Sequence, residues 1–399
     1  MVLASLALLS ACETPSRLSA VPYELTAQAV PAEGPLRFWP DEDPKPLIAE
    51  VEAAREREQR YRAAAGLTGP LPPSDFLAIS GGGDDGAFGA GLLVGWTQAG
   101  NRPEFRMVTG VSTGALIAPL AFLGPKYDDD LRKFYTTVTA KDIFRRRNII
   151  EGVLTDALYD TRPLARYIDR VVTRELLDQI AAEYAKGRSL FIGTTDLDVR
   201  RGAIWNMGAI AASHDPNALA LFRKVMLASA SIPGLFPPVM IDVTVNGKRY
   251  QEMHVDGGAT NQVFMYPETL PLGELVPDLT DPRERKVYVI RNARLDSGWA
   301  SVDRRTLKVI GRSVDALIHN QALGDLARIY ITANRDHIDY NLAFIPKDFD
   351  VTKEGAFRPD YMRPLFERGY EMGKSGYPWM KVPPGLVGPV DPTDRATVQ

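Results

Sequence analysis

Residues 80–91 read SGGGDDGAFGAG and place three consecutive glycines directly after the apolar run at 76–79. That run, Phe-Leu-Ala-Ile, is typical of a short buried strand, and residues 87–97 can form a helix. The glycines therefore lie in a strand-to-helix turn. Such a turn directs free backbone N–H groups outward at the positive end of a helix, which makes it an anion receptor.

Three kinds of protein use a turn of this type. In a dinucleotide-binding domain, Gly81-x-Gly83-x-x-Gly86 would be the phosphate-binding fingerprint and Glu104 the ribose-binding acid. In an acyl hydrolase, the N–H groups would hold the oxyanion of the transition state. In the third kind, the glycines only pack a helix against a strand. The turn alone leaves these interpretations open, because a single G-x-G-x-x-G match is a weak signal.

The composition indicates a globular protein without a general affinity for nucleic acid. The 399 residues are 45% hydrophobic and carry a formal net charge of −3. This length predicts one large domain or two smaller ones, and the charge gives no basic field. The short run Arg145-Arg146-Arg147 is explained by a solvated helix end or loop, so no nucleic-acid partner is expected.

The single cysteine, Cys12, excludes an intramolecular disulfide framework and a cysteine-based zinc site. It follows Leu9-Ser10-Ala11 at the end of an apolar segment, and this resembles the lipobox of a bacterial lipoprotein signal peptide. On that hypothesis residues 1–12 are the signal peptide, and lipid-modified Cys12 anchors the protein in the cell envelope, at the outer membrane facing the periplasm. The alternative is an ordinary apolar N-terminus, since no Lys or Arg precedes the run and the run is short.

Beyond the signal peptide, composition divides the chain into three parts. Residues 13–73 predict a proline-rich tether with a short charged helix at 47–65, residues 74–375 the main domain, and residues 376–399 a proline-rich tail. Strand-like and helix-like stretches alternate in the main domain, which predicts an α/β fold with helices on both faces of a sheet. We expect strands at 76–80, 105–109, 190–195, 203–207, 286–291 and 340–345, and helices at 87–97, 113–122, 129–138, 164–185, 218–229, 306–333 and 357–373.

A second motif, Gly110-Val111-Ser112-Thr113-Gly114, stands between the strand at 105–109 and the next helix. This is the context of a nucleophile elbow, in which a serine sits on a sharp turn between small neighbours. If the strands at 76–80 and 105–109 are parallel neighbours, both turns emerge at the same carboxyl edge of the sheet. The N–H groups of Gly82 and Gly83 would then lie beside the Ser112 hydroxyl as an oxyanion hole.

A nucleophilic serine needs a base. No surrounding pattern marks any of the histidines, which are His214, His254, His319 and His337. Asp256 is the better candidate, because it ends a strand and the two glycines after it let the backbone bring its carboxylate close to Ser112. An aspartate is a poor base at its ordinary pKa, so this role requires burial that raises the pKa. An ordinary Asp-Gly turn, and a triad using His319 or His337, are the alternatives.

Together these motifs resemble the patatin-like phospholipases. The glycine loop, the serine elbow and the Asp256-Gly257-Gly258 turn occur in that family's order and near its spacing, and residues 195–208 and 228–238 are also similar. The resemblance covers about residues 74–265. It implies a three-layer α/β/α sandwich with a mainly parallel sheet, and a Ser112–Asp256 dyad. The oxyanion hole would come from Gly81, Gly82, Gly83 and Gly86, and the motif glycines are Gly110, Gly114, Gly257 and Gly258.

The resemblance implies a serine acyl hydrolase without cofactor or metal. Its substrate would be a lipid or acyl ester met at a membrane surface, with residues 232–238 as a wall of the acyl channel. The family often carries a basic residue before the last loop glycine, where this chain has Asp85 after Asp84. That difference favours an ester over a phospholipid specifically. It also keeps open a catalytically silent lipoprotein that only binds lipid.

Overall fold

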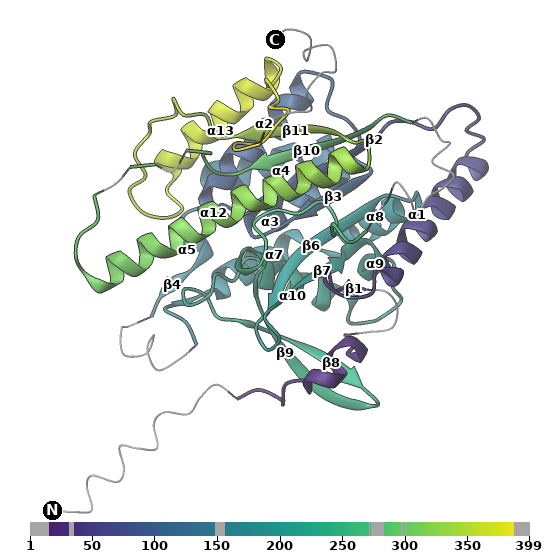
Figure 1. Cartoon of the computed structure of the whole chain (residues 1–399), viewed down its shortest axis with the longest axis horizontal. Coiled ribbons are helices and arrows are strands. Elements are labelled where there is room, and N and C mark those ends of the chain that lie inside the picture. Colours follow the sequence, from purple (N-terminus) through teal and green to yellow (C-terminus); the bar gives the residue numbers. More distant parts are fainter. Residues whose placement is uncertain are drawn as a thin grey trace, which may run out of the picture.

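The computed structural model of the protein (Figure 1) describes residues 16–31, 36–147, 156–270, 272, 283–296, 298–299 and 301–386. The expected signal peptide with Cys12 lies outside these residues, as do residues 387–399 of the expected tail. None of the described helices has both the length and the hydrophobicity of a membrane span.

Nine of the described strands form one sheet whose centre is parallel. The order is β1-β7-β6-β3-β2-β10-β11, and the β8–β9 hairpin joins through β6. Neighbours from β6 to β11 run parallel, whereas β1, β7, β8 and β9 are antiparallel to their partners. The bounds are β1 Arg37–Phe38, β2 Ser74–Ile79, β3 Met107–Gly110, β6 Ser189–Asp196, β7 Arg201–Asn206, β8 Val239–Val245, β9 Lys248–Asp256, β10 Arg285–Arg291 and β11 Asp339–Phe344. A separate pair, β4 Arg145–Arg146 with β5 Tyr159–Asp160, contains part of the arginine run expected in a helix end or loop.

Helices cover both faces of the sheet, as the alternation of elements predicts. Within β2, Leu77 and Ile79 pack with Phe88 into one core, while Phe76 and Ala78 pack with Leu326 into the other. The first core contains α2 Gly86–Gln98, α3 Thr113–Leu123, α10 Ala218–Ser229 and α13 Pro359–Lys374, and the second contains α12 Thr306–Arg335. In Figure 1, α12 runs diagonally across the near face. The expected three-layer sandwich is confirmed.

The remaining helices are short, apart from α1. Their bounds are α1 Lys45–Ala64, α4 Asp128–Thr137, α5 Ala140–Ile143, α7 Arg162–Val171, α8 Arg174–Ala185 and α9 Met207–Ala212, with 3-10 turns at Tyr23–Gln28, Gly83–Asp85, Pro125–Tyr127 and Gly257–Ala259. The single helix expected at 164–185 is in fact two, α7 and α8. The break occurs because the Thr173 side chain accepts a hydrogen bond from the Leu176 N–H at 3.3 Å and starts a new helix.

Two expectations about the ends of the chain need correction. The tether predicted at 13–73 packs on the domain over its described part: β1 extends the open edge of β7, and Glu58 of α1 forms ion pairs with Arg106 and Arg283. The first residues of the predicted tail also pack on the domain. Tyr377 is buried, and Met380 forms a β-bridge with Leu342. Backbone pairing with exposed sheet edges holds both segments down despite their prolines.

Helices α2 and α13 cross at unusually short range. A Cβ atom added at Gly91 would lie 2.0 Å from the Phe366 carbonyl oxygen, and one at Gly95 would lie 2.0 Å from that of Tyr370. On the other side, a Cβ at Gly369 would lie 2.3 Å from the Phe88 carbonyl oxygen. Only glycines allow the two backbones to approach this closely. The contact fixes α2, whose first turn carries the end of the glycine loop.

Candidate active site

Ser112 occupies the sharp turn between β3 and α3. Its backbone is in the left-handed region, with φ 54° and ψ −122°, which is strained for a residue with a side chain. The neighbouring glycines make the turn possible: a Cβ at Gly110 would lie 2.4 Å from the Gly114 carbonyl oxygen, and one at Gly114 would lie 2.2 Å from that of Ile79. The Ser112 N–H donates to the Ser229 hydroxyl at 3.0 Å, so the predicted nucleophile elbow is held from a second element, α10.

Asp256 ends β9 and lies against Ser112. Its pairing with Thr194 of β6 brings it to the strand beside β3, and its carboxylate accepts hydrogen bonds from the Ser112 side chain and from the Gly258 N–H at 2.7 Å. Only 5% of Asp256 is exposed. Burial raises the pKa of Asp256 to about 7, although the two hydrogen bonds act in the opposite direction. The pair that the sequence predicts is therefore in direct contact.

The glycine loop approaches the same serine from β2. A Cβ at Gly81 would lie 3.3 Å from the Ser112 Cβ. Of the four loop glycines, Gly81 donates its N–H to the Gln262 carbonyl oxygen at 2.9 Å, and the Gly86 N–H bonds back into its own turn. The N–H groups of Gly82 and Gly83 have no hydrogen-bond partner among the described residues. Of the four glycines predicted to contribute, Gly82 and Gly83 thus keep N–H groups without a described partner, and Gly81 is the one that contacts Ser112.

The comparison with protein families fits this geometry. Residues 77–267 match the model of the patatin-like phospholipases, a range that includes the glycine loop, Ser112 and Asp256. Residues 77–267 are a patatin-like phospholipase domain. The resemblance expected from the motifs is confirmed over this range, and it favours the hydrolase interpretation of the glycine loop over the dinucleotide one.

One solved structure is also similar to this chain. The chain is similar to the crystal structure of VipD from Legionella pneumophila, with 14% sequence identity and a TM-score of 0.38. The match covers 76% of this chain and 66% of VipD, just under two thirds of its length. A comparison with curated proteins found no match.

Gln262 and Asp325 brace both halves of the site, and no local sequence motif points to either residue. Gln262 accepts the Gly81 N–H through its carbonyl oxygen and donates its side-chain amide to the Gly258 carbonyl oxygen at 2.8 Å. Asp325 of α12 in turn accepts the Gln262 N–H at 2.6 Å. One side chain on α12 therefore positions the loop that connects Gly81 to Gly258.

Asn292, directly after β10, supports the glycine loop. Its side chain donates to the Ser80 carbonyl oxygen and accepts from the Gly89 N–H, each at 3.0 Å. Gly82 has φ 155°, and a Cβ there would lie 2.3 Å from the Asn292 carbonyl oxygen. The loop is thus clamped between β10 and the first turns of α2, which fixes the direction of its free N–H groups.

The acidic pair Asp84 and Asp85 is matched by a lysine from the loop after β11. The Lys353 ammonium lies 2.6 Å from the Asp84 carboxylate and 3.0 Å from that of Asp85. The Tyr361 hydroxyl also donates to Asp85, at 2.8 Å. Burial raises the pKa of Asp85, while Lys353 acts to lower it. The acids that stand where the family often has a basic residue therefore hold a lysine in place instead of facing solvent alone.

Replacing Lys353 by methionine should loosen the glycine loop. Asp84 is buried and would lose its cation, so we expect the free energy of unfolding to fall by about 1–3 kcal/mol, less than for a fully buried pair because Lys353 is partly exposed. Ester hydrolysis should fall as well. Denaturant unfolding and turnover of a soluble ester measure the two effects. Exposed Lys347 in the same loop is the matched control, and an equal loss in Lys347→Met would contradict the assignment.

The described histidines do not reach Ser112, whose hydrogen-bond partners are Ser229 and Asp256. His254 instead forms a buried cluster with Asp196 and Glu252, whose ligand atoms lie within 4.8 Å of one another. Arg37 forms an ion pair with Glu252 inside this cluster, and Thr194 bonds the other ring nitrogen of His254. The Arg37 guanidinium already pairs with Glu252, so the residues fit a structural ion-pair network better than a metal site. The expected independence from cofactors stays a prediction.

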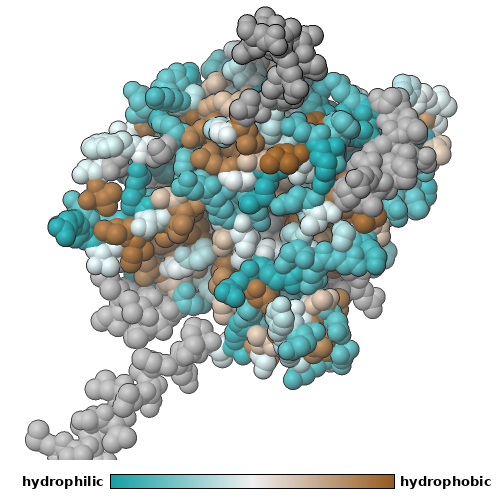
Figure 2. Space-filling model, viewed as in Figure 1, coloured by the Kyte–Doolittle hydropathy of each residue, from teal (hydrophilic) through white to brown (hydrophobic). Residues whose placement is uncertain are grey.

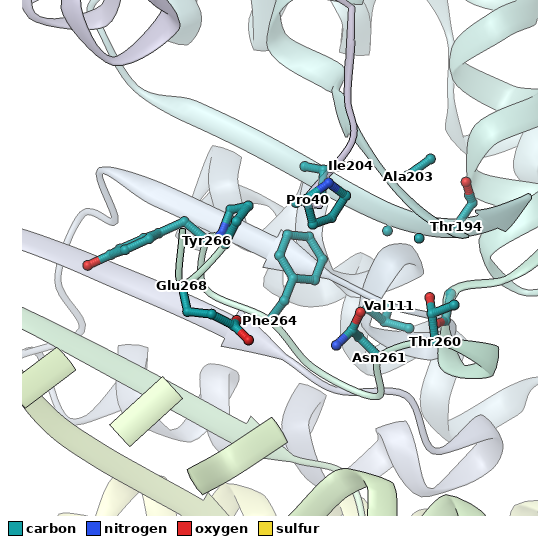
Figure 3. A pocket seen from close by; sticks show the side chains of 14 residues that line it. Pro40, Val111, Thr194, Ala203, Ile204, Thr260, Asn261, Phe264, Tyr266 and Glu268 are labelled. Atoms are coloured by element: carbon teal, nitrogen blue, oxygen red, sulfur yellow. The ribbon is translucent and has the colours of Figure 1, made fainter. Parts of the chain in front are cut away.

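A small cavity is lined by residues adjacent in the chain to Ser112 and Asp256 (Figure 3). Val111 and Gly257, the chain neighbours of Ser112 and Asp256, are among its lining residues, and the Phe264 ring lies beside Pro40 across it. Its volume is about 60 Å³, enough for a few water molecules but not for an acyl chain. In the predicted channel wall at 232–238, Phe236 is buried against Phe144 and Tyr159 and thus belongs to the core.

Proposed function

We propose that this protein is a serine acyl hydrolase of lipid esters that uses Ser112 as nucleophile and Asp256 as general base. The observation that carries this proposal is the hydrogen bond between the Ser112 and Asp256 side chains, next to the unpartnered N–H groups of Gly82 and Gly83. The patatin-like family supports lipid acyl hydrolysis in general. A role in lipid catabolism or remodelling, and a lipid anchor at Cys12 in the outer membrane of a bacterial envelope, belong to the same proposal.

The geometry supports a two-step reaction. Asp256 accepts the Ser112 proton as the serine oxygen attacks the ester carbonyl, and the N–H groups of Gly82 and Gly83 stabilise the resulting oxyanion. Asp256 then gives the proton to the departing alkoxide, which leaves as an alcohol or lysolipid. In the second step Asp256 removes a proton from water, the hydroxide attacks the acyl-serine, and collapse releases the fatty acid and returns the proton to Ser112.

Hydrolysis should depend on pH through Asp256. The base acts only when ionised, and burial raises its pKa to about 7, so kcat/KM should be constant above that pH and fall about tenfold for each pH unit below it. A pH–rate profile with a soluble nitrophenyl ester measures this. A plateau that extends down to about pH 5 would show a base with an ordinary carboxylic acid pKa and would contradict the assignment.

Two experiments test the proposed function. A fluorophosphonate, which reacts with activated serines, should label Ser112, and mass spectrometry of the peptide identifies the position. Incubation with a short-chain ester, a long-chain ester, a phospholipid and a lysophospholipid, followed by analysis of released fatty acid, distinguishes esterase, phospholipase and lysophospholipase. A folded protein that is not labelled and releases no fatty acid, yet binds these lipids, would support the alternative of a silent lipid-binding protein.

A further inference from the structure

The amino-terminal half of α12 exposes an apolar stripe. Ile310, Val314 and Leu317 follow one another at the spacing of one helix face and are 54%, 46% and 71% exposed. Nearby Trp299 is 91% exposed. Figure 2 shows hydrophobic side chains gathered at the left of the molecule, where Figure 1 places this half of the helix. A contiguous exposed apolar patch of this kind marks an interaction surface in a soluble domain.

The carboxyl-terminal half of α12 packs into the hydrophobic core. Its apolar residues Ala322, Leu326, Ile329 and Ala333 are buried against the sheet. The change occurs near residue 320, beyond which the helix packs on β10 and β11. The exposed stripe therefore does not belong to the hydrophobic core, and packing within the described part of the chain does not explain it.

Basic side chains outnumber the acidic ones, Asp303 and Asp315, around the stripe. Arg304, Arg305 and Lys308 are exposed at the start of α12, form no ion pair with described residues, and have no acidic residue in the first turn beside them. Cations at a helix amino terminus oppose the helix dipole, so these residues do not serve helix stability. An exposed helix that combines an apolar stripe, a nearby tryptophan and basic flanks is typical of a segment lying on an anionic membrane.

The exposed half lies next to the catalytic edge of the sheet. Asp325, which follows it on α12, holds Gln262 and through it Gly81 and Gly258. Between the helix and the glycine loop lies a cavity of about 320 Å³, lined on one side by Ile318 and His319 and on the other by Asp85 and Lys353. A surface that touched the stripe would therefore stand beside this cavity, on the side of the molecule that carries Asp85 of the glycine loop.

We propose that the amino-terminal half of α12, together with Trp299, docks the protein onto an anionic lipid bilayer and turns the catalytic edge toward it. A second copy of this chain fits the surface less well, because its own stripe is bordered by the same basic residues, Arg304, Arg305 and Lys308, and so offers them little opposite charge. The benefit for catalysis rests on the proposed lipid hydrolase function, but docking itself does not require turnover.

Vesicle sedimentation tests the docking. The full chain carries Cys12→Ser, which removes the expected lipid anchor, and Ser112→Ala, which prevents hydrolysis. We expect this protein to bind vesicles of equal parts phosphatidylcholine and phosphatidylglycerol, and to bind pure phosphatidylcholine more weakly. Leu317→Glu should weaken binding about tenfold, since it removes one buried apolar side chain from the bilayer and adds a negative charge. Arg304→Glu with Lys308→Glu should reduce binding only to the anionic vesicles.

Ile331→Glu is the matched control, since Ile331 is 59% exposed at the other end of the same helix. It should bind like the parent, and with Ser112 intact both glutamate variants should hydrolyse a soluble ester normally. Unchanged binding in Leu317→Glu, or an equal loss in Ile331→Glu, would overturn the proposal. So would a parent dimer that Leu317→Glu converts to a monomer, because the stripe would then be a subunit interface. If the protein with Ser112 intact binds vesicles but hydrolyses no ester, the hydrolase function is refuted and the docking proposal stands.

Discussion

Replacing Ser112 by alanine should lower kcat/KM for ester hydrolysis by about 10⁴-fold or more, because no other group can form the acyl intermediate. Asp256→Asn should cause a loss of similar size, since the neutral amide cannot accept the serine proton. The measurement is steady-state hydrolysis of a soluble nitrophenyl ester by the purified full chain. Exposed Ser375 provides the control, and Ser375→Ala should be indistinguishable from the parent.

Thermal unfolding separates a catalytic loss from a folding defect. Because burial raises the pKa of Asp256 to about 7, ionising it costs stability in the folded protein and the penalty is complete above that pH. The neutral Asp256→Asn variant should therefore unfold at no lower temperature than the parent under alkaline conditions. Turnover that survives in Ser112→Ala would refute the proposed nucleophile. Loss of turnover in His319→Gln or His337→Gln would restore the triad alternative.

The second large effect is expected at Gly82. A methyl group there would meet the Asn292 carbonyl oxygen at 2.3 Å, and φ of 155° is unfavourable for alanine, so the loop must move. Moving it misplaces the N–H groups proposed to stabilise the oxyanion, and losing such a donor lowers kcat by about 10²–10³-fold. We expect Gly82→Ala to show this fall in kcat, with a smaller change in KM, in the same ester assay.

Gly247 is the matched control for Gly82. It also has a positive φ, 77°, but lies in the β8–β9 turn, where an added Cβ would meet nothing within 4 Å. Gly247→Ala should therefore cost some stability and leave kcat unchanged. An unchanged kcat in Gly82→Ala would mean that the oxyanion is stabilised by groups outside this loop.

The sequence predicts the central part of the site because those residues lie in local motifs. A strand, small neighbours and a following helix identify Ser112, and two glycines after a strand identify Asp256. Parallel pairing of β2 with β3, the expected result for strands joined by a helix, brings the glycine loop to Ser112. Asp256 reaches Ser112 by another route, because β9 pairs with β6 and β6 pairs with β3. The β8–β9 hairpin was missed although Asn246-Gly247 is a strong turn signal with positive φ at both residues.

The bracing residues have no such local signature. Asp325 and Gln262 are 63 positions apart, and Ser229 meets Ser112 across 117 positions. Each looks like an ordinary polar residue until the tertiary fold brings it to a backbone group that needs a partner. The same holds for Lys353, which compensates Asp84 and Asp85 from more than 260 residues further along the chain. A motif predicts which residues react, but these supports depend on long-range packing.

The close crossing of α2 and α13 has a consequence for how the protein folds during its synthesis. The glycine face of α2 is complete early in translation, whereas the backbone of Phe366 and Tyr370 that covers it is synthesised more than 270 residues later. Until then the helix that follows the glycine loop has one uncovered side. A nascent chain therefore holds its serine elbow long before it holds a rigid site, and we expect the proposed ester cleavage to begin only after α13 has emerged and packed.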